Sequence, residues 1–188
     1  MDVAAKPYPA GVFIHPAIEA CLTLSSAEGV AADAIERVRL QVHPLGAGLT
    51  GKREPQGAYD AQVSVYHWAA AALVKKAAGL DEASDASVSD PAIIAMRHRV
   101  VVNVDDALRA DEAIASVEMR DGTTRRVHVP HCLGSAARPM SDRDLEGKFL
   151  AQAADVLPLP RAQQLVDTCW SLHSAADVSR AASGIWGH

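Results

Sequence analysis

The chain has 188 residues, of which 49% are hydrophobic and 22% are charged, enough for a hydrophobic core without disulfides or a metal. Its 18 lysines and arginines against 23 aspartates and glutamates give a net charge of -5, which disfavours nucleic acid and anionic membranes as partners. Three widely separated cysteines, no signal-like N-terminus and no apolar segment of transmembrane length predict a cytoplasmic protein with reduced thiols.

The first thirty residues predict an irregular segment followed by a short helix. Pro7 and Pro9 disfavour regular structure over residues 1–14, because each proline restricts its own φ and the residue before it. The helix begins at Pro16, which suits a first helical turn, and ends between residues 26 and 29.

A strand, a loop and a long helix follow. Strict alternation of apolar and polar residues over 35–42 predicts a half-buried strand that ends before Pro44. Residues 45–57 contain four glycines and one proline, and this composition predicts a long loop. Apolar residues three or four apart over 60–78 predict one helix that ends at Gly79.

The next elements are a short helix, a strand and a hairpin. Ser89 or Asp90 caps a helix whose first turn contains Pro91, and a strand follows over 99–104. An Asp-Gly pair between alternating segments at 113–119 and 124–129 predicts two antiparallel strands joined by a tight turn.

The C-terminal part is predicted to be all-helical. After a turn-rich loop at 131–140, residues 141–144 resemble a capping box that opens a helix, and further helices are predicted at 160–173 and 174–182. The fold class is therefore α+β, a small domain of helices and antiparallel sheet followed by a helical segment. That segment is too short to enclose a core of its own, so it must lie against another surface.

No motif for metal, nucleotide or acyl-transfer chemistry is present. The eight histidines include no pair at metal-ligand spacing, so we predict no metal site. Cys132 beside His131 admits two interpretations, a thiolate nucleophile or a small semi-buried thiol, and the second is favoured. A glycine-rich phosphate loop and a nucleophile elbow are both missing.

Lys6 lies in the proline-rich segment KPYP. An ammonium group on a stiff loop suits a substrate carboxylate or, once desolvated, proton transfer. Taken alone, however, a solvated lysine beside two structural prolines is the simpler interpretation.

Several motifs, in order along the chain, resemble the MmgE/PrpD family, which includes 2-methylcitrate dehydratase, cis-aconitate decarboxylase and iminodisuccinate epimerase. The segment KPYPAGVFIHPAIEA at 6–20 matches best, followed by YDAQVS at 59–64 and the hairpin around Asp121 and Gly122. GSAARPMS at 134–141, which continues into LEGKF at 145–149, also resembles a family segment.

The resemblance implies a large helical domain that bears a smaller α/β lid, with a final helical segment returning to the large domain. Residues 1–139 then resemble the lid and 140–188 the returning helices. Alanine-rich faces of the helices at 60–78 and 141–156 are expected to lack their broad neighbours, and so to be exposed or covered by self-association. The other partners predicted are a small polycarboxylate substrate, a missing or separate helical domain, and further copies in a homo-oligomer.

The resemblance also implies roles for individual residues. Lys6 matches a family lysine that faces substrate carboxylates and acts in proton transfer, whereas Gly11 stands where the decarboxylase carries histidine, which argues against decarboxylation. Arg138 is a candidate for bidentate carboxylate binding. His15 is a further candidate for substrate binding, and no cofactor is implied.

Gln62 and Ser64 are also candidates for carboxylate binding, although hydrogen bonding at the start of a helix is the simpler interpretation of both.

Three functions remain open. The first is the C-terminal lid part of a hydro-lyase or epimerase/isomerase that removes a proton next to a carboxylate, inactive without the helical domain. The second is a non-catalytic binding or assembly module that pairs with a separately encoded helical partner. The third is a stand-alone oligomeric enzyme that uses Lys6 and His15.

Overall fold

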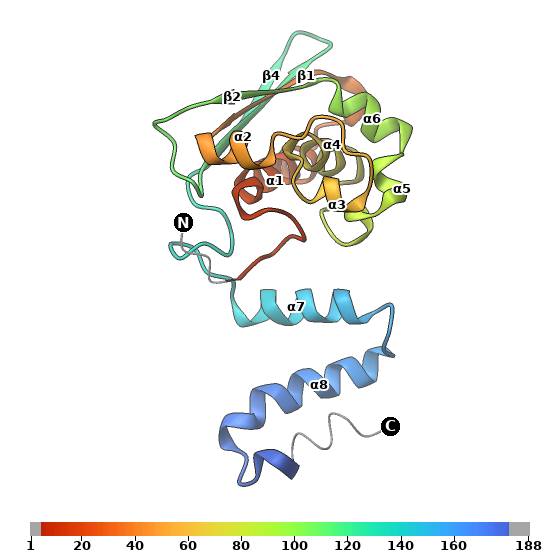
Figure 1. Ribbon diagram of the computed structural model, residues 1–188, viewed down its shortest axis with the longest axis vertical. Helices are drawn as coiled ribbons and strands as arrows, with labels where there is room; N and C mark the ends of the chain where they lie inside the picture. The colour runs from red at the N-terminus through yellow and green to blue at the C-terminus, as the bar shows by residue number, and fades with distance from the viewer. Residues whose placement is uncertain (1–4, 181–188) are drawn as a thin grey trace. The chain divides into compact units, whose positions relative to one another are not determined.

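A computed structural model describes residues 5–180 (Figure 1). The chain divides into two compact units, Met1–Met140 and Ser141–His188, and each is described by itself.

The first unit contains a four-stranded sheet in the order β2-β1-β3-β4. Its strands are β1 (Ile35–Val42), β2 (Val100–Val104), β3 (Ala113–Met119) and β4 (Thr124–Val129). Strands β1, β3 and β4 pair antiparallel, with Leu40 opposite Ala115, whereas β1 and β2 are parallel. The α+β class and all four strands are confirmed, but the sheet is mixed rather than antiparallel.

The helices of the first unit come mostly from the segment that connects β1 to β2, since parallel strands need a long crossover. In chain order the helical elements are η1 (Val12–Ile14), α1 (His15–Leu22), η2 (Thr23–Ala27), η3 (Ala32–Ala34), α2 (Pro44–Thr50), α3 (Ala58–Ala61), α4 (Val65–Lys75), η4 (Asp81–Ala83), α5 (Asp85–Val88) and α6 (Pro91–Arg97). The helix predicted from Pro16 begins one residue earlier, and Asp90 caps α6 as predicted by accepting a hydrogen bond from the Ala92 backbone N–H.

One hydrophobic core holds the first unit together. Helix α1 packs on β3 and β4, and α4 packs on α1, α6 and β2, so that the helices lie on one face of the sheet (Figure 1). The inward residues of β1 are Val38, Leu40 and Val42, all essentially inaccessible to solvent, while Arg39 on the outer face pairs with Glu118 at 2.6 Å. The alternation in the sequence therefore marks the buried face correctly.

The prediction of a loop throughout 45–57 is wrong for its first part, where α2 forms. Pro44 occupies the first turn of α2, and the Leu45 backbone N–H donates to Nδ1 of His43 at 3.2 Å. Glycine is a poor helix former, but a Cβ at Gly46 would lie 3.3 Å from the Phe13 carbonyl oxygen, so this close approach favours glycine. Tertiary packing thus overrides the local preference.

The single helix predicted over 60–78 is also wrong, because α3 and α4 are separate. Ser64 is the N-cap of α4 and accepts a hydrogen bond from the His67 backbone N–H at 3.1 Å. Helix α4 ends at Lys75, with Lys76 in the left-handed conformation, rather than at Gly79. Its alanines 69–72 are buried in the core of the first unit, so no outside neighbour is needed for them.

In its described residues the second unit has the helices α7 (Asp142–Ala153) and α8 (Leu159–Ser171), the turn η5 (Leu172–Ser174) and helical residues at 178–180. The predicted capping box is confirmed: Ser141 accepts from the Asp144 N–H, and the Asp144 side chain accepts from the Ser141 N–H. The helix predicted over 174–182 is helical at 178–180, and its last two residues lie outside the described part.

Each helix in residues 5–180 is either too short or too polar to cross a bilayer.

Candidate functional site

The segment that carries Lys6 is held at both ends by backbone hydrogen bonds. At its start the Ala5 N–H donates to the Gly134 carbonyl at 3.3 Å, and at its end the Gly11 N–H donates to the Gln62 carbonyl at 2.8 Å. Lys6 itself is exposed to solvent. Two prolines and two end contacts therefore fix the backbone while the ammonium group stays accessible.

Helix α1 contacts the buried side of this segment through His15. The His15 ring is 1% exposed, lies edge-on to Tyr8 with ring centroids 5.4 Å apart, and places Nε2 at 3.3 Å from the Ala10 carbonyl oxygen. A residue this buried supports the Lys6 segment from inside, on the side away from solvent.

One turn later on α1, Glu19 holds the loop 131–140. Its Oε2 accepts the Leu133 backbone N–H at 2.8 Å, and its Oε1 accepts from Nη1 of Arg138. Arg138 also donates to the His131 carbonyl at 3.3 Å, and half of its side chain remains exposed. Since His15 and Glu19 are four residues apart, they lie on one face of α1 and fix both segments.

Gly134 brings the loop 131–140 against the start of the Lys6 segment. Its φ of +85° suits glycine, and a Cβ there would lie 2.1 Å from the Ala5 carbonyl oxygen. Its N–H donates to the Arg138 carbonyl at 2.8 Å, which closes the loop. The backbone that carries Lys6 is thus adjacent to the loop that carries Arg138.

Two weak acids behind this junction are held in their neutral forms. Burial raises the pKa of Cys132 to about 12, and the nearby charges of Glu19 and Asp111 act in the same direction. Burial also raises the pKa of Tyr8 well above its usual range, reinforced by Glu19 and Cys132. A buried thiol of this kind is no nucleophile at neutral pH, which supports the structural interpretation of Cys132.

The remaining predicted residues lie at the junction of α3 and α4. Ser64 is buried, and its hydroxyl caps α4 and donates to the Lys52 carbonyl, so its hydrogen-bonding groups serve the helix start. The side chain of Gln62 is exposed. The backbone carbonyl oxygen of Gln62 accepts a hydrogen bond from the backbone N–H of Gly11, at the end of the Lys6 segment. The structure therefore brings Gln62, but not the Ser64 hydroxyl, to the surface beside that segment.

The candidate site contains two accessible cations, Lys6 and Arg138, on segments whose backbones are joined by the hydrogen bond from Ala5 to Gly134. Such a pair can bind a dianionic ligand, with the guanidinium fixed by Glu19. Sequence reasoning missed Glu19, Tyr8 and Gly134, although the spacing of four from His15 to Glu19 was a signal that both side chains share one helix face.

In the described part of the chain, no group of three histidine, cysteine, aspartate or glutamate side chains is arranged to hold a metal ion.

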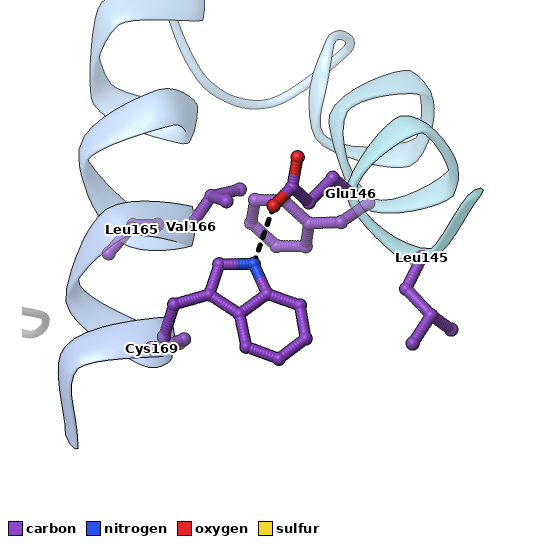
Figure 2. A pocket seen from close by; sticks show the side chains of 7 residues that line it. Leu145, Glu146, Leu165, Val166 and Cys169 are labelled. Carbon is purple, nitrogen blue, oxygen red and sulfur yellow. Dashed lines mark hydrogen bonds between the residues drawn. The ribbon is translucent and has the colours of Figure 1, made fainter. Parts of the chain in front are cut away.

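The second unit has an apolar groove of its own between α7 and α8. The residues that line it include Leu145 and Glu146 from α7 and Leu165, Val166 and Cys169 from α8 (Figure 2). Phe149 and Trp170 complete the lining, and the Trp170 indole N–H donates to Glu146 Oε1 at 2.7 Å. Most of the lining side chains are apolar, so the groove suits an apolar neighbour.

Comparison with known proteins agrees with the motifs. The family model of the MmgE/PrpD C-terminal domain matches residues 8–172. No curated protein matches the chain.

Proposed function

Because the chain belongs to the MmgE/PrpD family, we propose that it forms the C-terminal, lid-bearing part of a hydro-lyase or epimerase/isomerase of small polycarboxylates such as 2-methylcitrate. Residues 1–139 act as the lid and 140–188 as helices that join the helical domain. Arg138 binds a substrate carboxylate, and Lys6, which faces the carboxylates, acts in the transfer of the proton that is removed from the carbon next to one of them.

The proposal rests mainly on one observation: the segments that carry Lys6 and Arg138 are bonded to each other and are both held by helix α1. The Ala5–Gly134 hydrogen bond joins their backbones, and α1 holds one segment through His15 and the other through Glu19. Removal of a proton next to a carboxylate makes a dianionic, enolate-like intermediate, and fixed cations stabilise that charge without reorganising. No cofactor is required by this chemistry.

The test is dehydration of 2-methylcitrate and citrate by the purified chain, alone and mixed with a helical domain from a family member. We expect turnover only in the mixture. In the mixture, Lys6→Ala reduces kcat about a hundredfold or more. Lys6→Arg keeps KM near the wild-type value but not kcat, because guanidinium keeps its proton.

Lys75→Ala is the matched control, since Lys75 is a surface lysine paired with Asp90 at 2.6 Å. An unchanged rate in Lys6→Ala would remove Lys6 from the mechanism. Turnover at an enzyme-like rate by the chain alone would contradict its dependence on a helical domain, and would favour the stand-alone oligomeric enzyme.

The apolar groove of the second unit favours a second candidate, a non-catalytic module that pairs with a separate helical partner. Exposed Phe149 and Trp170 suit an interface with another helix. A chain that remains a monomer in sedimentation and binds no added helical domain would contradict this candidate.

A further inference from the structure

A network of charged side chains lies beside the loop 131–140 and has no role in the proposed function. Nδ1 of His131 lies 2.7 Å from Oδ2 of Asp111, and Nε2 of His128 lies 2.7 Å from Oε1 of Glu112. Arg109 links the two pairs, with Nη2 at 3.1 Å from Glu112 and Nε at 3.8 Å from Asp111.

The two histidines use different ring nitrogens. Asp111 engages Nδ1 of His131, which sets the tautomer and leaves Nε2, the atom at the end of the ring, for another partner. The Asp111 side chain is 14% exposed and that of His131 is 39% exposed, so the carboxylate lies on the inner side. In His128 the end nitrogen itself is engaged by Glu112. The inner carboxylate of Asp111 therefore holds the outer imidazole of His131 in one orientation.

His131 belongs to the same loop as Arg138, and its carbonyl accepts from Nη1 of Arg138 at 3.3 Å. Bond lengths keep the Nε2 atom of a histidine within about 7 Å of its own carbonyl oxygen. A ligand with two or more carboxylates that pairs with Arg138 is therefore within reach of His131.

We propose that His131, oriented by Asp111, is a further binding residue of this site and that its imidazolium form takes one carboxylate of a polycarboxylate ligand beside Arg138. The inference rests on the proposed function. A carboxylate at Nε2 favours the charged ring, so binding takes up a proton and affinity rises as the pH falls. The charged and titratable groups around His131 are Asp111, Arg109, Glu112, His128, Cys132, Arg138 and Glu19.

The experiment measures citrate binding to the full chain by calorimetry at pH 6 and pH 8, in buffers of different ionisation enthalpy. The number of protons exchanged on binding is compared between wild type and His131→Asn, because protons released by citrate itself contribute to both measurements. We expect His131→Asn to take up fewer protons and to bind about tenfold more weakly at pH 6, with a smaller loss at pH 8.

Asp111→Asn keeps an acceptor for Nδ1 but removes the charge that supports an imidazolium facing the ligand, so it should weaken citrate binding at pH 6 without abolishing it. His128→Asn is the matched control, and it should behave as wild type. Circular dichroism confirms that each variant is folded.

Equal proton uptake in His131→Asn and wild type, or equal losses in His131→Asn and His128→Asn, would overturn the role of His131 and leave the proposed function standing. Citrate binding that Arg138→Ala leaves unchanged would count against the proposed function instead. If the wild-type chain binds no citrate at either pH, the role of His131 in this chain falls, whereas the proposed function is tested by turnover in the mixture with a helical domain.

Discussion

Glu112 is a carboxylate that is only 8% exposed, at the start of β3, where neighbouring donors balance its charge. Its Oε1 lies 2.7 Å from Nε2 of His128, and its Oε2 accepts from the Arg109 side chain at 3.1 Å and the Arg109 backbone N–H at 3.2 Å. Burial alone raises the pKa of Glu112, but the contacts with His128 and Arg109 outweigh burial and hold the pKa below its usual value.

Because of this lowered pKa, the stability of the folded state depends on pH. The folded state binds a proton at Glu112 less tightly than the unfolded state does. The ionised Glu112 therefore stabilises the fold at pH values above its pKa in the unfolded chain, and this stabilisation is lost as the pH falls through its pKa in the folded protein. We expect the free energy of unfolding of wild type to fall more between pH 7 and pH 3 than that of Glu112→Gln. Urea unfolding across that range measures it.

Glu36→Gln is the control, because Glu36 is exposed on β1. It should follow the wild-type curve. Identical pH dependence in all three proteins would mean that Glu112 contributes nothing to acid unfolding.

At this scale the sequence identifies residues that carry motifs, but not their partners. Lys6 and Arg138 could be chosen as candidates because they stand in recognisable segments. The residues that contact these segments could not be chosen from the sequence. Gly134 contacts Ala5, and Glu19 accepts a hydrogen bond from Arg138, and each pair is separated by more than a hundred residues of chain. Such contacts depend on how α1 packs under the sheet, which no local pattern encodes.

At the scale of elements, the Lys6 segment and the loop 131–140 depend on one another at Gly134. Gly122 in the β3–β4 turn has almost the same backbone, with φ +83° against +85°, but no atom lies within 4 Å of a Cβ placed there. The two glycines therefore separate the effect of backbone conformation from that of close approach.

Gly122→Ala should lower the free energy of unfolding by about 1 to 2 kcal/mol, because alanine is unfavourable in the left-handed conformation. Gly134→Ala should cost about 1 to 3 kcal/mol more, since its Cβ would displace Ala5 and with it the Lys6 segment. Thermal unfolding of the two variants measures the difference, and citrate binding should weaken only in Gly134→Ala. Equal losses of stability would mean that the Ala5 contact is easily rearranged.

An element could be predicted from the sequence where the residues that determine it lie within its own segment. Strand β1 was predicted to the residue because its alternation and Pro44 both act within the segment. Helix α2 was missed because Gly46 reduces local helix propensity but is required by Phe13, thirty-three positions earlier. The break before α4 was also missed, although Ser64 is a good N-cap, because the apolar spacing continued through it.

At the scale of the whole molecule, the two units differ in how much apolar surface they enclose. The core cluster of the first unit extends from Ala10 to Cys132 and includes the fully buried Trp68. In the described part of the second unit, the buried apolar side chains are Ala153, Ala162 and Val166. The hydrophobic content of the sequence suggested one self-sufficient protein, but among the described residues the buried apolar side chains are concentrated in the first unit.

Residues 1–140 produced alone should therefore fold and unfold cooperatively, as circular dichroism during urea titration will show. Residues 141–188 produced alone should be mostly unfolded at low concentration, because α7 and α8 have 12 and 13 residues, near the lower limit for isolated helices. If helicity of this peptide rises with its concentration, the groove lined by Phe149 and Trp170 binds another copy, and Trp170→Ala should abolish that rise. A cooperative transition that is independent of concentration would instead show that this segment folds stably without a second copy or a partner.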